Sequence, residues 1–271
     1  MSVTMRPISI LTIAGSDSGG GAGIQADLKT FAAHRVHGLS AIAALTAQHT
    51  RGVTAVSVPS VDFLRAQIDA CFEDFNIGAS KLGMLANAGV IDAVADALRT
   101  HKPPFVVLDP VMLATSGAKL LEDAALDALR LHLIPLASVI TPNLPEAELL
   151  LGHAVTDLTG MRAAASELLS LGAASVFLKG GHLQGHGDVV VDLFADSTGL
   201  REIAHPRLRI EAHGTGCTLA SAVAANLCLG LSLAEACSAA SDYVHAALLK
   251  GYRPGRSDIV VLDHFGAAPA R

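Results

Sequence analysis

The sequence predicts an α/β fold in which helices cover both faces of a central, mostly parallel β-sheet. Three observations lead to this prediction: short apolar runs alternate with helical patterns, the runs are apolar at successive positions, and glycine-rich or polar residues follow several of them. Strands that are apolar on both faces are typical of a parallel sheet buried between helical layers. The alternating order favours a doubly wound domain.

The elements are expected in the order that such a domain requires. Five runs rich in β-branched residues are expected as parallel strands, and two later runs without a helix between them as an antiparallel edge. The expected strands are 8–14, 79–82, 105–108, 138–140 and 175–178, followed by 188–195 and 208–211. The expected helices are 22–34, 61–74, 87–100, 122–132, 144–151, 159–171, 215–229 and 232–248.

Length and composition indicate a single domain, 1–271. No stretch stands out as a linker, and no internal repeat is visible. Hydrophobic residues make up 51 % and charged residues 16 % of the chain, so a core can be filled and global disorder is excluded. The net charge of −6 leaves no basic excess for binding nucleic acid or anionic lipid, so neither is expected as a partner.

Three features bear on the cellular location. Residues 214–234 carry no charge, but they are rich in Gly, Ala, Ser and Thr, so a buried helix is expected there rather than a membrane span. The opening run 8–14 ends in Gly-Ser-Asp, which is not a cleavage signal. The cysteines form no CxxC pair and no zinc-spaced cluster, so a reducing cytoplasm is the expected location. They are Cys71, Cys217, Cys228 and Cys237.

A glycine-rich loop, 15–23, follows the first expected strand and precedes the first helix. Glycine permits positive φ and close approach of the backbone to a ligand. No Lys follows the glycines as in a P-loop, and the spacing does not fit a dinucleotide fingerprint. A mobile turn and a ligand loop both stay open, although the place at the carboxyl end of a strand favours the ligand loop.

A second glycine loop, 213–218, opens the long uncharged helix. Backbone N–H groups at a helix N-terminus would converge there on developing negative charge. The same position would lower the pKa of Cys217 and favour its thiolate. The alternative is a Thr-capped helix with a small buried Cys, and the local sequence favours neither.

Charged and polar residues follow three of the expected strands. Asp109 follows 105–108, Asn143 and Glu146 follow 138–140, and Lys179 follows 175–178. Carboxylates at the carboxyl edge of a sheet suit Mg²⁺, and a lysine there suits a phosphate chain. Each residue alone could be a cap or a surface charge. Together with the two glycine loops they predict a phosphoryl-transfer site.

Seven motifs, in order and spanning roughly residues 8–250, resemble those of the hydroxymethylpyrimidine/phosphomethylpyrimidine kinase family. No single motif is specific, but the ordered set is. The motifs occupy residues 14–31, 47–50, 81–84, 108–112, 141–146, 178–182 and 214–219.

The resemblance implies a ribokinase-like fold: a three-layer αβα sandwich with a mostly parallel sheet and no full lid domain. It also implies use of ATP and Mg²⁺, and two successive phosphorylations of 4-amino-5-hydroxymethyl-2-methylpyrimidine, to the monophosphate and then to the diphosphate used for thiamin synthesis. By position in the motifs, the pyrimidine would contact Gln48, Gly15, Ala22, Asp27, Met84 and Val111. Asp109 and Glu146 would organise Mg²⁺, and Asn143, Lys179 and Thr215 would contact ATP. Gly214, Thr215, Gly216 and Cys217 would form an anion hole in which Cys217 takes the place of an aspartate base in the wider group.

Two departures from related patterns are visible. Residues 254–264 keep only an acidic-His pair of the glycine-rich segment that is usual near the C-terminus of the family. Between Gly15 and Gln48 there is too little chain for the full lid of the sugar kinases. A neighbouring subunit is therefore expected to close the site, which favours a homodimer.

Two alternatives remain at this point. A pyridoxal kinase, or a dual-specificity enzyme, would have the same architecture and a similar heteroaromatic alcohol as substrate. Gln48 separates the two because its amide offers both a donor and an acceptor to an aminopyrimidine edge. A non-catalytic pyrimidine-binding protein is the other alternative, but a pure binder would not need Asp109, Glu146, Lys179 and Cys217 together.

Overall fold

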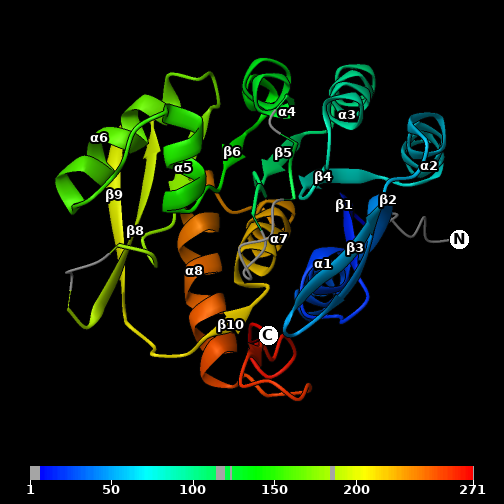
Figure 1. The fold of residues 1–271 in the computed structure, drawn as a ribbon. Coiled ribbons are helices and arrows are strands. Elements are labelled where there is room, and N and C mark those ends of the chain that lie inside the picture. Colours follow the sequence, from blue (N-terminus) through cyan, green and yellow to red (C-terminus); the bar gives the residue numbers. More distant parts are fainter. Residues whose placement is uncertain (1–6, 114–119, 123, 184–186, 271) are drawn as a thin grey trace, which may run out of the picture.

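The protein is a three-layer αβα sandwich around a sheet in the order β3-β2-β1-β4-β5-β6-β7-β8-β9 (Figure 1). The computed structural model describes residues 7–113, 120–122, 124–183 and 187–270. The six central strands are parallel, and β3, β8 and β9 pair antiparallel at the two edges. The strands are β1 (Ser9–Asp17), β2 (His37–His49), β3 (Gly52–Ser57), β4 (Ile77–Leu82), β5 (Phe105–Leu108), β6 (Val139–Ile140), β7 (Ser175–Leu178), β8 (Val189–Asp196) and β9 (Gly199–Pro206).

The helices form a layer on each face of the sheet (Figure 1). One layer holds α1 (Gly23–Ala33), α7 (Thr215–Cys228) and α8 (Leu233–Leu249). The other holds α2 (Val61–Asp74), α3 (Ala88–His101), α4 (Ala125–Ala128), α5 (Leu144–Leu151) and α6 (Leu158–Leu169), with a π-turn at Leu129–Leu133 and a 3₁₀ turn at Ile134–Leu136. Two short strands, β10 (Ala212–His213) and β11 (Val260–Val261), pair in parallel outside the main sheet.

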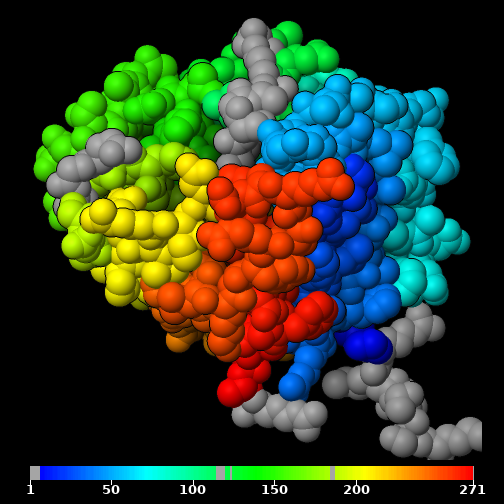
Figure 2. All heavy atoms as spheres, turned by 60° about the horizontal axis from the view of Figure 1, so that its bottom comes forward, coloured from blue at the N-terminus to red at the C-terminus, as the bar shows by residue number. Residues whose placement is uncertain are grey.

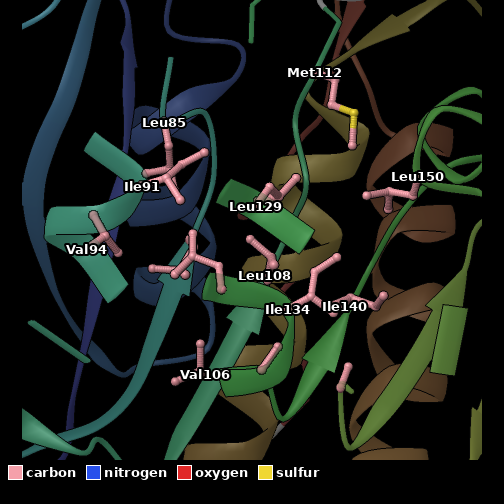
Figure 3. Close-up of a cluster of buried hydrophobic side chains, with 14 of the residues drawn as sticks. Leu85, Ile91, Val94, Val106, Leu108, Met112, Leu129, Ile134, Ile140 and Leu150 are labelled. Atoms are coloured by element: carbon pink, nitrogen blue, oxygen red, sulfur yellow. The ribbon is translucent and has the colours of Figure 1, made fainter. Parts of the chain in front are cut away.

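The central strands are apolar at successive positions because both of their faces are buried. On β5, Leu108 packs with the layer of α3 to α6, whereas Val107 packs with the layer of α1, α7 and α8. Figure 3 shows the first of these clusters, in which Leu108 and Ile140 of the sheet lie among side chains of the helical layer such as Leu129 and Ile134. The expected αβα sandwich with a mostly parallel sheet is thereby confirmed.

The expected strands and helices are found with two kinds of error. The strands β2, β3 and β9 and the short β10 and β11 were not expected, and 208–211 is not a strand. The residues of β3 and β9 are largely exposed, so these strands need no continuous apolar run and none marks them in the sequence. The expected helix 122–132 is broken into α4 and a π-turn, and its residue 123 lies outside the described residues.

Within the described parts of the chain, no helix is long and apolar enough to cross a membrane. The uncharged helix α7 lies instead inside the protein, where every residue from Thr218 to Leu227 is buried. Small side chains suit this position because they let α7 pack closely against its neighbours.

The C-terminal residues fold back onto the N-terminal part of the molecule. β11 pairs with β10 directly before α7, and Tyr252 forms a further bridge to Val261. In Figure 2 the C-terminal residues, orange to red, lie against the blue N-terminal part. The divergent segment 254–264 therefore reaches the glycine loops, because Val261 pairs with His213 at the start of the second one.

Candidate active site

A cavity of about 390 Å³ opens at the carboxyl ends of the parallel strands. Both glycine loops and all three expected strand-end positions contribute to its wall, as expected for a doubly wound sheet. Of the residues predicted for the site, the lining includes Gly15, Ala22, Gln48, Met84, Val111, Asp109, Asn143, Glu146, Lys179, Gly214, Thr215, Gly216 and Cys217. Thirteen residues from segments that are distant in sequence thus meet at one place.

The first glycine loop is held from inside by Asp17. Its carboxylate accepts hydrogen bonds from the backbone N–H groups of Gly19, Gly21 and Ala22 at 2.7, 2.9 and 2.8 Å. Although burial opposes ionisation, the hydrogen bond to His213 and those from the backbone lower the pKa of Asp17. These hydrogen bonds hold the loop in the wall of the cavity.

The second glycine loop packs on the first one and faces the strand-end charges. Gly214 has φ of +84°, and a Cβ there would collide with the Gly21 carbonyl oxygen. A Cβ on Gly216 would lie 3.0 Å from Lys179 Nζ and 3.5 Å from Asp109 Oδ2. The N-terminus of α7 therefore points at the lysine and the carboxylate, where only glycine leaves the backbone open to a ligand.

Lys179 lies between the two carboxylates. Its Nζ is 3.1 Å from Asp109 Oδ1 and 4.0 Å from Glu146 Oε2. Burial opposes the charge of Lys179, but the two carboxylates raise its pKa. Burial also raises the pKa of Glu146 to about 7, against the attraction of Lys179. The site is a compact charged cluster, so a change in the charge of a bound ligand would strongly affect the pKa values of these side chains.

The helix α5 fixes two of these side chains. The side chain of Asn143 accepts a hydrogen bond from Glu146 N at 2.9 Å, and Glu146 Oε2 accepts one from Asn143 N at 2.8 Å. This capping box holds both residues at the cavity. Asn143 and Glu146 therefore cap α5 and line the cavity at the same time.

The donor set fits a magnesium ion that keeps several of its waters. Among the described residues, no group of three or more His, Cys, Asp or Glu side chains could hold a metal. Two carboxylates, Asp109 and Glu146, line the cavity near a lysine, and Mg²⁺ is commonly bound by one or two carboxylates plus substrate phosphates and waters. The residues present therefore fit Mg²⁺ bound together with a nucleotide.

The expected lowering of the Cys217 pKa is wrong. Burial and the nearby carboxylates of Asp109 and Asp27 raise the pKa of its thiol to about 12, although Lys81 and the Gly23 backbone N–H oppose this. The partial positive charge of the α7 N-terminus therefore does not offset the loss of water around the sulfur. These surroundings favour the thiol of Cys217 over its thiolate.

The expected place of Asp27 in the pocket wall is also wrong. Asp27 is completely buried and is not among the residues that line the cavity. Its carboxylate accepts hydrogen bonds from Thr12 at 2.6 Å, Ser221 at 2.7 Å and Lys81 at 2.9 Å. Asp27 therefore supports the cavity floor from behind by joining β1, α1, β4 and α7.

Lys81 and His213 are cavity residues that were not predicted to have a role. Lys81 lies at the cavity floor with a fully buried side chain. A lysine in a strand that is otherwise apolar is the signal that could have found it, because a buried cation needs an acidic partner. His213 Nε2 lies 2.8 Å from Gln48 Nε2, and no local signal indicates this contact.

Comparison with known proteins places these features in a family. The sequence model described as phosphomethylpyrimidine kinase matches residues 17–261. A curated relative from Rhizobium meliloti, named hydroxymethylpyrimidine/phosphomethylpyrimidine kinase, is 52 % identical over 242 residues, which are 88 % of this chain and 89 % of the relative.

Two solved structures are also similar. A phosphomethylpyrimidine kinase from Clostridium difficile 630 has a TM-score of 0.79 and 41 % identity, with 88 % of this chain and 98 % of that chain covered. A pyridoxal kinase from Staphylococcus aureus, in complex with AMP-PCP and pyridoxal, has a TM-score of 0.87 and 31 % identity, with 96 % and 94 % covered. The backbone is close to both, so side chains of the site must distinguish their substrates.

Proposed function

This chain belongs to the phosphomethylpyrimidine kinase family, and we infer that it uses ATP to phosphorylate 4-amino-5-hydroxymethyl-2-methylpyrimidine and then its monophosphate. The product, a diphosphate, serves thiamin synthesis. The observation that carries this function is the approach of the α7 N-terminus to Lys179 and Asp109 in one cavity. The fold is ribokinase-like, as in the pyridoxal kinase neighbour.

The phosphoryl group would pass from ATP to the acceptor in the space between the α7 N-terminus and Lys179. The N–H groups of 214–217 would stabilise the charge of the transferring group, and Lys179 would hold the phosphate chain. Asn143 and Thr215, which line the cavity, would contact ATP. Asp109 and Glu146 would hold Mg²⁺ mainly through water, and the ion would neutralise charge on the phosphates.

The acceptor would lie against the first glycine loop. Gly15, Ala22, Met84 and Val111 provide a mostly apolar wall, and the Gln48 amide provides the polar group that an aminopyrimidine edge requires. A Cβ on Gly15 would lie 3.1 Å from Met84 Sδ, so the glycine leaves room for a flat ring. Asp27 would act from behind this wall by fixing α1 to α7.

The thiol of Cys217 would shape the anion hole and would not act as the base. Its raised pKa leaves almost no thiolate at neutral pH. Phosphoryl transfer depends mostly on positioning and charge stabilisation, so the alcohol proton can leave late in the first step. In the second step the acceptor is a phosphate, which already carries negative charge.

The protein would act in the cytoplasm as a homodimer. The edge strand β3 is exposed, and large apolar side chains lie exposed on and beside it: Leu45 is 47 %, Val56 45 % and Phe63 62 % exposed. An exposed edge with apolar neighbours is usually covered in natural proteins, and a second copy would cover it. Sedimentation of the purified protein tests this directly; a monomer at working concentration would refute it.

The function is tested by separate initial rates for the pyrimidine alcohol, its monophosphate and pyridoxal, with ATP and Mg²⁺. Phosphorylation of both pyrimidines, with pyridoxal as the weaker substrate, is expected. Fast turnover of pyridoxal alone would favour the pyridoxal kinase alternative. Binding of the pyrimidine without ATP consumption would favour a non-catalytic role.

A further inference from the structure

A second cavity adjoins the first one, and the two meet at Gln48 and His213. The second cavity has a volume of about 380 Å³ and lies between the β2–β3 turn and the C-terminal segment. Gln48 and His213 line both cavities. Their contact, 2.8 Å between the two Nε2 atoms, therefore stands at the boundary between them.

The position of His213 is fixed by several contacts besides the one with Gln48. Its backbone is in β10, which pairs with Val261 of β11. Its Nε2 is 3.3 Å from Asp17 Oδ2, and a Cβ on Gly21 would lie only 2.8 Å from its Cδ2. Asp17 is in turn held by three backbone N–H groups. The imidazole is thus a rigid neighbour for a flexible Gln48 side chain.

Counting protons favours one orientation of the Gln48 amide. The Thr46 hydroxyl has a single proton, and it lies 2.9 Å from the Ser16 carbonyl oxygen and 3.0 Å from Gln48 Oε1, while Gln48 Nε2 faces His213 Nε2. Because His213 Nε2 also lies 3.3 Å from the Asp17 carboxylate, which can only accept, Nε2 carries a proton and meets Gln48 Nε2 donor to donor. Exchanging Oε1 and Nε2 of the Gln48 amide removes this conflict. If Thr46 donates to Ser16, only the NH₂ group of Gln48 can bond to Thr46. The amide oxygen then faces His213, whose Nε2–H can donate to it and to Asp17. Rotating the amide by half a turn would break this set.

We propose that His213 is a positioning residue that sets the orientation of the Gln48 amide and thereby the preference of the site for an aminopyrimidine. The proposal rests on the proposed function, in which Gln48 reads the pyrimidine edge. That edge has an amino donor beside a ring-nitrogen acceptor. Only one orientation of an amide matches this pair, and the other places donor against donor.

A ligand without the amino group should not depend on this orientation. The 5-hydroxymethyl-2-methylpyrimidine that lacks the 4-amino group keeps the ring and the alcohol but presents no donor. The wild-type protein is therefore expected to prefer the amino compound. A protein without His213 is expected to lose most of that preference, because Gln48 can then rotate freely.

The test is calorimetric binding of the two pyrimidines to the wild type, His213→Phe and His213→Ala. Phe keeps a planar ring without a hydrogen bond, and Ala avoids any crowding against Gly21. The ratio of the two dissociation constants is expected to fall about tenfold in both variants, since one buried hydrogen bond loses its partner. Equal weakening of both ligands would mean that His213 only shapes the wall, and the proposal would be wrong.

Gln48→Met and the double variant Gln48→Met/His213→Phe complete the cycle. If Gln48 reads the edge, Gln48→Met alone abolishes the preference, and adding His213→Phe changes it no further. If Gln48→Met leaves the preference intact, the proposed role of Gln48 fails. If Gln48→Met abolishes it and His213→Phe does not reduce it, only the proposal for His213 fails.

Discussion

Two lysine–aspartate pairs lie within the same site, and their surroundings differ. Lys81 and Asp27 are both completely buried, with Nζ 2.9 Å from Oδ1. Lys179 and Asp109 are 3.1 Å apart, and the lysine keeps 15 % of its side chain exposed toward the cavity. Their positions in the sequence also differ, since Lys81 lies within a buried strand whereas Lys179 follows one.

The difference lies in how many hydrogen bonds the protein itself supplies. The Asp27 carboxylate also accepts hydrogen bonds from the hydroxyls of Thr12 and Ser221, so few of its lone pairs remain for a ligand. Among the described residues, the side chain of Asp109 accepts a hydrogen bond of 3.3 Å from Thr141 besides its contact with Lys179. A saturated buried pair holds elements together, whereas an unsaturated one at a cavity can exchange its partner for phosphate or metal.

The largest expected effect on stability comes from breaking the completely buried pair, Lys81–Asp27. Lys81→Met leaves the Asp27 carboxylate buried without its cation, which typically costs 3–5 kcal/mol of unfolding free energy. Urea unfolding at neutral pH measures this. In the double variant Lys81→Met/Asp27→Leu no buried charge remains, and most of the lost stability is expected to return. A double variant as unstable as the single one would show that the pair is not the cause.

The pair at the cavity, Lys179–Asp109, should affect turnover more than stability. Lys179→Met is expected to lower kcat by about 10² to 10³, the cost of losing one preorganised group at a developing charge. Its unfolding free energy should change much less than that of Lys81→Met, because water can reach Asp109 through the cavity. Initial rates and urea unfolding on the same preparation check both statements. A variant that unfolds as easily as Lys81→Met would remove the distinction between the pairs.

Asp109 and the neighbouring carboxylate Glu146 should set the metal requirement. Asp109→Asn and Glu146→Gln are each expected to raise the half-saturating Mg²⁺ concentration by about tenfold or more, as is typical for altered metal surroundings. Binding of the pyrimidine without ATP, measured by calorimetry, should stay close to that of the wild type. Wild-type Mg²⁺ dependence in both variants would contradict the metal assignment.

The smallest effect on turnover is expected at Cys217. Because its pKa is raised to about 12, Cys217→Ala should slow both phosphorylations by similar factors of less than about tenfold. A helix N-terminus alone would have predicted a thiolate base, and hence a selective loss of 10² to 10⁴ in the first step. Separate rates with the alcohol and the monophosphate decide between these outcomes.

Alkylation of Cys217 gives an independent measure of the same pKa. A raised pKa keeps the thiol protonated below pH 9, so the rate of modification by iodoacetamide should rise about tenfold for each pH unit up to that value. Cys217→Ser identifies the contribution of this residue by peptide mapping. Rapid modification at pH 7 that does not increase with pH would indicate a thiolate instead.

The sequence by itself determined the layers of the fold and the position of most site residues. Strands buried on both faces leave continuous apolar runs, and a parallel arrangement delivers whatever follows each run to one edge of the sheet. Asp109, Glu146 and Lys179 could therefore be found from their positions after three runs. The exposed strands β3 and β9 could not, because their pairing depends on neighbouring strands and not on burial.

Only the tertiary structure decided what surrounds each side chain. Asp27 was assigned to the pocket wall, but Lys81, 54 residues away, and Ser221, 194 residues away, hold it behind that wall. The pKa of the Cys217 thiol is raised mainly because folding removes it from water, with carboxylates from other elements adding to the effect. Gln48 meets His213 across 165 residues. Hydrogen bonds and charges act through space, so a local sequence pattern does not indicate partners that only the folded structure brings together.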